Sequence, residues 1–140
     1  MDVLYTAEAT AWGGREGRAA CSDGTLDVQL RVPVELGGPG GDGTNPEELF
    51  ATGYAACFHS ALKLVAAGMK RDVSQSAITA RVGIGPNGAG GFGLAVELIG
   101  ELPGLPSDQA HELLAKAHEV CPYSNATHGN VDVVLTLHED

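Results

Sequence analysis

The sequence is poor in basic side chains. Only 8 residues are lysine or arginine, against 18 aspartate and glutamate residues, which gives a formal net charge of −10. A protein that binds nucleic acid neutralises several phosphates with clustered basic side chains, and the sequence has no such cluster. The same deficit argues against binding to an anionic membrane surface. We therefore expect neither a nucleic acid nor a membrane among the partners.

Long apolar runs and paired cysteines are also missing. We find no continuous apolar run of the length that spans a bilayer, and the first residues lack the basic and apolar regions of a secretory signal. The three cysteines, Cys21, Cys57 and Cys121, form no CxxC pair, which excludes a thioredoxin-type motif and a four-cysteine zinc site. Their small, odd number favours a reducing compartment. We expect a cytoplasmic protein with no bound metal or cofactor.

The chain nevertheless contains enough apolar residues to fold. It is 44% hydrophobic, and 140 residues is an ordinary size for one domain, so we predict a single domain over 1–140. The patterns of apolar residues predict both strands and helices. The expected strands are 3–11, 17–21, 26–34, 76–84, 92–102 and 131–138, and the expected helices are 46–67 and 107–120. This βββ-α-ββ-α-β order favours an α+β fold with antiparallel sheets over a parallel, doubly wound fold.

The helix at 46–67 has clear end signals and an apolar composition. Asn45 suits the N-cap position with Glu48 three residues later, and Gly68 follows the far end. Lys63 is the only charged residue after Glu48, so the helix is apolar around nearly its whole circumference. We therefore predict a central, buried helix.

Taken singly, the candidate chemical groups have ordinary explanations. Phe50, Tyr54, Cys57 and Ala61 fall on one face of the helix. Such an apolar stripe is typical of a core, in which a cysteine is a small buried hydrophobe. Arg15 lies in the turn GGREG and on its own is an exposed charge.

In combination, the same residues carry a resemblance to a known family. The segments TNPEELFATGYAACF at 44–58 and CPYSNATHGN at 121–130, with an arginine in the first turn, closely resemble the organic hydroperoxide resistance proteins. These form the Ohr branch of the OsmC/Ohr family, and the resemblance covers essentially the whole chain. It implies an OsmC/Ohr-like α+β fold with antiparallel sheets around the long helix. It also implies an intertwined homodimer with sites at the subunit interface.

The resemblance further implies roles for individual residues. Cys57 is implied to be the peroxidatic cysteine and Cys121 the resolving cysteine, with a disulfide between them as the oxidised product. Arg15 and Glu47 are implied to form the polar part of the site, whereas Cys21 matches no family motif and is expected to be structural. The implied activity is a thiol peroxidase that reduces alkyl and fatty acid hydroperoxides to alcohols under oxidative stress. Its implied reductant is dihydrolipoamide on lipoylated enzymes, supplied by the dihydrolipoamide dehydrogenase system.

These residue types suit peroxide chemistry. A thiolate attacks one peroxide oxygen and the other leaves as alkoxide, so a nearby cation favours the reaction. Burial would raise the pKa of Cys57, which also lies too far along its helix for the dipole to lower that pKa much. Arg15 is then the group that favours the thiolate. Glu47 precedes Cys57 by roughly 15 Å along the helix axis, so we expect it to act by holding the guanidinium.

The surroundings of the thiol leave alternatives open. An apolar set would suit an organic hydroperoxide, or would simply be core: Leu49, Phe50, Tyr54 and Phe58. Other readings are an OsmC-branch peroxidase, a non-catalytic thiol redox sensor, and a Cys-His hydrolase that uses His59. We give the hydrolase little weight because His59 points to another helix face than Cys57.

Glycine is abundant, with 20 residues. The glycine-rich segment GGPGGDGT lacks the Gly-Lys-Ser/Thr ending of a phosphate loop, so we interpret it as a flexible loop. Gly13, Gly14 and Gly17 flank Arg15. We expect the turn that carries Arg15 and the loop before Glu47 to be mobile.

Overall fold

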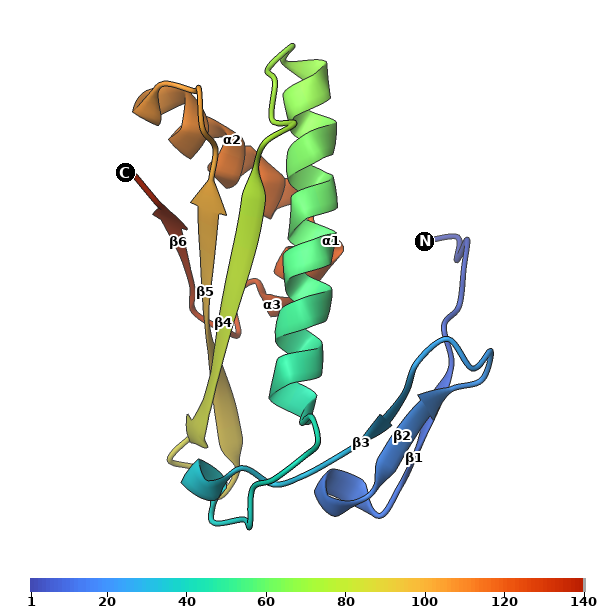
Figure 1. The fold of residues 1–140 in the computed structure, drawn as a ribbon. Coiled ribbons are helices and arrows are strands. Elements are labelled where there is room, and N and C mark those ends of the chain that lie inside the picture. The colour runs from blue at the N-terminus through green and yellow to red at the C-terminus, as the bar shows by residue number, and fades with distance from the viewer. Residues whose placement is uncertain (140) are drawn as a thin grey trace. The chain divides into compact units, whose positions relative to one another are not determined.

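The computed structural model describes residues 1–139. The chain divides into two compact units, Met1–Leu49 and Phe50–Asp140. Helix α1 (Pro46–Gly68) begins in the first unit and continues into the second (Figure 1). The expectation of one domain over 1–140 stays a prediction.

The first unit is built on a small antiparallel sheet. Its elements are β1 (Ala9–Trp12), the 3-10 turn η1 (Gly14–Glu16), β2 (Arg18–Cys21), β3 (Asp27–Gln29) and the 3-10 turn η2 (Val34–Leu36). The strands pair in the order β1-β2-β3. The two outer strands are shorter than the predicted 3–11 and 26–34, because the central strand β2 has only four residues with which they can pair.

The second unit contains a three-stranded sheet of mixed direction. Its strands are β4 (Ala77–Pro86), β5 (Phe92–Glu101) and β6 (Val133–Leu137), in the order β4-β5-β6. The predicted α+β class is confirmed, and β4 and β5 form the predicted antiparallel hairpin. The strand β6, however, runs parallel to β5, where we predicted antiparallel sheets throughout. The reason is the connection, since two helices return the chain to the same end of the sheet: α2 (Ser107–Val120) and α3 (Pro122–Thr127).

The core of the second unit lies between one sheet face and the helices. Val96 and Leu98 alternate inward from β5 and pack with buried side chains of both long helices. Gly100 continues this inward row. A Cβ atom there would lie 2.7 Å from Cδ2 of Leu114 on α2 and 2.9 Å from Cδ1 of Leu102. The glycine therefore allows α2 to approach the sheet closely.

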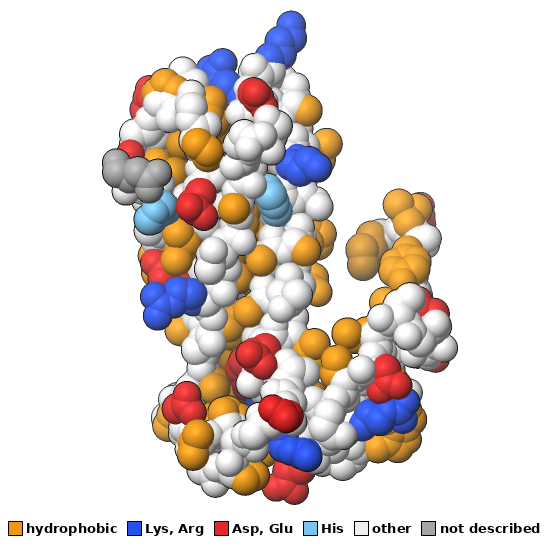
Figure 2. All heavy atoms as spheres, viewed as in Figure 1, with side chains coloured by type: hydrophobic (Ala, Val, Ile, Leu, Met, Phe, Trp, Pro, Cys, Tyr) orange, Lys and Arg blue, Asp and Glu red, His pale blue; other side chains and the backbone are white. Residues whose placement is uncertain are grey.

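Helix α1 matches its predicted start and extends one residue beyond its predicted end. Its amino-terminal end is capped as expected, since the Glu48 amide donates to Oδ1 of Asn45 at 2.8 Å. The prediction of a helix buried on all sides is wrong for the single chain. The buried residues lie along one face, whereas Leu64 is 69% exposed. Hydrophobic side chains also follow the exposed side of the helix in Figure 2.

The composition of α1 has one further consequence. By length and composition alone the helix could cross a membrane, a property that the core helices of soluble proteins share. The helix is nevertheless not a continuous apolar run, since polar residues such as His59, Ser60 and Lys63 interrupt it.

Candidate active site

Two thiols from distant parts of the sequence meet in the second unit. Cys57 lies in the middle of α1, and Cys121 lies between α2 and α3. Their Sγ atoms are 3.7 Å apart although the residues are 64 positions apart in the chain. Both are free thiols. Cys121 has no exposed surface, whereas Cys57 is partly exposed.

The position of Cys121 follows from the proline after it. Pro122 disfavours a helical conformation at the preceding residue, and Cys121 is extended, with φ −64° and ψ 125°. Its amide still donates to the carbonyl of Ala117 at 2.9 Å, and its own carbonyl accepts from the amide of Asn125 at 2.9 Å. Cys121 is thus a one-residue joint between two helices. The predicted helix 107–120 ends here as expected. The helix α3 was not predicted, although Pro122 at its first position was an available signal.

The environment of Cys57 within this unit disfavours the thiolate. Burial raises the pKa of the Cys57 thiol most strongly. A hydrogen bond from the backbone amide of Tyr123 acts in the opposite direction and lowers this pKa, while the adjacent Cys121 thiol raises it further. The net pKa lies above the ordinary value, so a peroxidatic Cys57 needs an additional positive charge. The Tyr123 amide is a site group that sequence reasoning did not identify.

Arg15 and Glu47 form a two-pronged ion pair in the first unit. Nη1 and Nη2 of Arg15 donate to the two carboxylate oxygens of Glu47 at 2.8 and 2.7 Å. The 3-10 turn supplies the arginine, and Gly13 and Gly14 before it have φ values of 80° and 59°, which suit glycine. The hydrogen bond lowers the pKa of Glu47 and raises the pKa of Arg15. The two hydrogen bonds between Arg15 and Glu47 are the contact that we expected, and the orienting role of Glu47 stays a prediction.

The four predicted apolar contacts divide into two classes. Tyr54 and Phe58 have no exposed surface and belong to the core, so for these two we retain the core interpretation. Leu49 and Phe50 are half-buried. The Phe50 ring stacks on Tyr123 with ring centres 5.8 Å apart.

The remaining candidate groups lie elsewhere. Cys21 is half-buried in β2 of the first unit. The Nε2 atom of His59 is 2.9 Å from Oγ of Ser76 and so takes part in a hydrogen bond of its own. Among residues 1–139, we find no group of three or more His, Cys, Asp or Glu side chains that could hold a metal ion.

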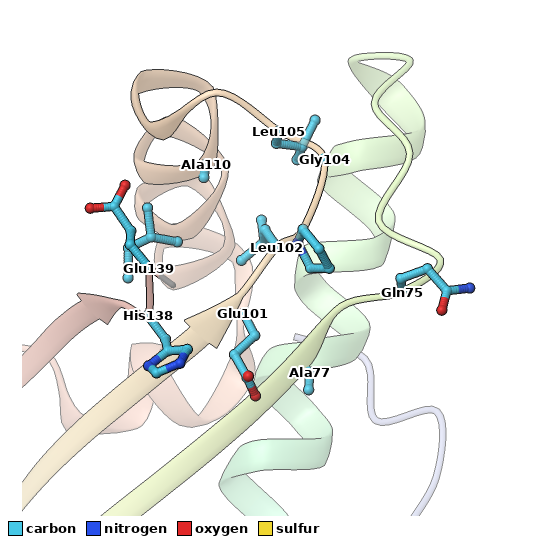
Figure 3. A pocket seen from close by; sticks show the side chains of 11 residues that line it. Gln75, Ala77, Glu101, Leu102, Gly104, Leu105, Ala110, His138 and Glu139 are labelled. Atoms are coloured by element: carbon cyan, nitrogen blue, oxygen red, sulfur yellow. The ribbon is translucent and has the colours of Figure 1, made fainter.

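A cavity of about 320 Å³ lies in the second unit beside the carboxyl-terminal end of β5 (Figure 3). Gln75, Glu101 and His138 line it together with the apolar Leu102 and Leu105. Its lining includes neither cysteine of the thiol pair, so we assign it no part in the thiol chemistry.

Known proteins share both this sequence and this fold. A family model described as OsmC-like protein matches residues 37–136. The chain is 60% identical over 136 residues to the organic hydroperoxide resistance protein of Xanthomonas axonopodis pv. citri, covering 96% of this chain and 95% of that one. The crystal structure of OhrB from Bacillus subtilis matches with a TM-score of 0.88 at 44% identity, covering 97% and 100% of the two chains. An organic hydroperoxide resistance protein from Legionella pneumophila matches with a TM-score of 0.93 at 48% identity, covering 99% and 100%.

Proposed function

Since this chain belongs to the OsmC/Ohr family, we propose that it is a cysteine-based peroxidase that reduces organic hydroperoxides to alcohols in the cytoplasm. Several close relatives are named as organic hydroperoxide resistance proteins, which supports resistance to such peroxides as its role. The observation that carries the proposed chemistry is the pair of free thiols with sulfurs 3.7 Å apart.

The proposed reaction has two steps on the protein. The Cys57 thiolate attacks the terminal oxygen of the hydroperoxide, the O–O bond breaks, and the alkoxide leaves and takes up a proton to give the alcohol. Cys57 is then a sulfenic acid. The sulfur of Cys121 attacks that of Cys57, a disulfide forms, and the hydroxyl leaves as water.

An external dithiol must return two electrons to complete the cycle. We propose dihydrolipoamide on a lipoylated enzyme as this reductant, regenerated by a dihydrolipoamide dehydrogenase system. Thiol-disulfide exchange passes through a mixed disulfide and ends with Cys57 and Cys121 reduced and the lipoamide oxidised. The chain itself holds no cofactor in this scheme.

We assign Arg15 the task of favouring the thiolate and the departing alkoxide. The need for a cation follows from burial, which raises the pKa of Cys57. A guanidinium stays charged at all working pH values and offers several donors in a fixed arrangement. Glu47 would keep it oriented through the two hydrogen bonds described above. Leu49 and Phe50, both half-buried, are our remaining candidates for contact with the alkyl group of the substrate.

We further propose that the active form is a homodimer. The exposed apolar side of α1, which includes Leu64, supports this because large apolar side chains on a helix face are usually covered by a partner. Size-exclusion chromatography with light scattering tests the proposal. A monomer that retains full activity at high dilution would contradict it.

The decisive test is peroxide consumption with defined reductants. Wild type should consume tert-butyl hydroperoxide with dihydrolipoamide faster than with thioredoxin, and faster than it consumes hydrogen peroxide. Cys57→Ser should lose the activity, Arg15→Ala should lose most of it, and Cys21→Ser should retain it as the matched cysteine control. Mass spectrometry after one equivalent of peroxide should find a 57–121 disulfide.

Other outcomes of this test identify the competing functions. A preference for hydrogen peroxide would indicate an OsmC-branch peroxidase. Oxidation of Cys57 once per molecule, with no recycling by any dithiol, would indicate a redox sensor and refute the peroxidase.

A further inference from the structure

A buried hydroxyl lies at the centre of a network around the Cys121 joint. The Oγ atom of Ser124, on α3, lies 2.8 Å from Oη of Tyr54 on α1 and 2.7 Å from Nδ1 of His118 on α2. A serine hydroxyl has one donor hydrogen and two acceptor sites, so it can bond to both partners at once. Ser124 is 2% exposed and Tyr54 is fully buried. One hydroxyl group therefore links three helices in the core.

The partners are spaced regularly about the two thiols. Tyr54 precedes Cys57 by three residues, while His118 precedes and Ser124 follows Cys121 by three residues. The bond from His118 to Ser124 therefore spans the extended joint at Cys121. The bond from Tyr54 to Ser124 ties α3 to the turn of α1 that precedes Cys57, because residues three apart are neighbours on a helix.

The surroundings of the histidine in this network favour its neutral form. Burial lowers the pKa of His118, and the nearby His128 lowers it further. A neutral imidazole nitrogen either donates to or accepts from the serine hydroxyl, so the bond persists without a buried charge.

We propose that Ser124 is a positioning residue for the disulfide step, which braces the Cys121 joint so that its sulfur stays beside that of Cys57. This inference rests on the proposed peroxidase function. In that step the Cys57 sulfenic acid and the Cys121 thiol join and release water, and the sulfurs close from 3.7 Å to about 2.05 Å. Without the hydrogen bonds of Ser124, the chain at Cys121 samples other angles between α2 and α3. The sulfenic acid then survives longer and meets a second peroxide molecule, which oxidises it to sulfinic acid.

The test measures how the sulfenic acid divides between two products. Wild type and Ser124→Ala are treated with increasing equivalents of tert-butyl hydroperoxide, quenched by alkylation, and analysed by mass spectrometry for the 57–121 disulfide and for Cys57 sulfinic acid. We expect the ratio of sulfinic acid to disulfide to rise about tenfold in Ser124→Ala, since the half-buried His118 loses its partner and the Tyr54 hydroxyl keeps only the Thr127 hydroxyl at 3.3 Å. Tyr54→Phe, which keeps the ring and removes one arm of the brace, should raise the ratio in the same direction.

A matched control separates positioning from a general loss of stability. Ser76→Ala removes a serine hydroxyl that is half-buried and, like that of Ser124, is bonded to a histidine, here His59 at 2.9 Å. This variant should keep the wild-type product ratio even if its melting temperature falls. A wild-type product ratio in Ser124→Ala would refute the positioning role of Ser124. If Ser124→Ala does not fold, a wild-type ratio in Tyr54→Phe would overturn it instead.

The same experiment distinguishes failure of the brace from failure of the proposed function. If wild type forms no 57–121 disulfide, both the peroxidase scheme and the brace are refuted. If wild type forms it and the variants keep the wild-type ratio, the scheme stands and only the role of Ser124 is refuted.

Discussion

Oxidation of the thiol pair should stabilise the fold by an amount that follows from the separation of the cysteines. Cys57 and Cys121 are 64 positions apart in the chain. A crosslink over a loop of this length lowers the entropy of the unfolded chain by about 14 cal/mol/K, or ~4 kcal/mol at 25 °C. The sulfurs have to approach by less than about 2 Å to reach bonding distance. We therefore expect little strain in the folded state, so that most of this gain appears as stability.

Urea unfolding followed by circular dichroism measures this gain. A Cys21→Ser background prevents other disulfides, and the reduced and peroxide-oxidised samples are compared at one protein concentration. With a slope of about 2 kcal/mol per M, the midpoint should rise by about 2 M on oxidation. Cys121→Ser given the same peroxide should show no rise. A gain below about 1 kcal/mol in the oxidised protein would refute the reasoning, because the sulfurs would then close only with strain in the fold.

Three further predictions concern the ion pair and the packing of the sheet. The pKa of Glu47 lies below its ordinary value of 4.5, so the stability from its pair with Arg15 is present above that pH and is lost as the pH falls through the lowered pKa. Glu47→Gln should remove this part of the acid sensitivity. The effect should be at most about 1 kcal/mol, because the Arg15 side chain is 40% exposed. Urea unfolding midpoints between about pH 6 and pH 3 measure the effect, and an acid sensitivity equal to that of wild type would contradict the prediction. Gly100→Ala should destabilise the fold by about 1–3 kcal/mol, because its methyl group would overlap Leu114. Gly83→Ala, whose new methyl group would have its nearest neighbour at 3.9 Å, should be nearly neutral in the same thermal unfolding assay, and equal losses in the two variants would refute the packing argument.

Local patterns in the sequence predicted the elements whose ends are determined locally. Asn45 and Glu48 define the start of α1 through a hydrogen bond between near neighbours, so the sequence alone identifies it. The direction of β6 depends instead on how two helices return the chain to the sheet. No alternation of apolar residues contains that information, and the parallel pairing was missed.

The candidate site, like the fold, was only partly predictable from the sequence. The roles of Cys57, Cys121, Arg15 and Glu47 came from the family resemblance, since each residue alone is equally consistent with an ordinary core or surface position. The structure adds distances that no spacing rule provides, including the 3.7 Å between the two sulfurs. The part played by Ser124 was not predictable, because its hydroxyl acquires its partners only when three helices pack together.

In the proposed cycle, the unequal burial of the two cysteines would decide which sulfur of the disulfide the reductant attacks. Cys121 has no exposed surface, whereas Cys57 is partly exposed. An incoming thiolate must reach the sulfur that it attacks, so it bonds to Cys57 and expels Cys121 as the leaving group. The mixed disulfide between protein and reductant should therefore form on Cys57. One cysteine would then receive both the oxidant and the reductant, while its buried neighbour exchanges bonds with Cys57 alone.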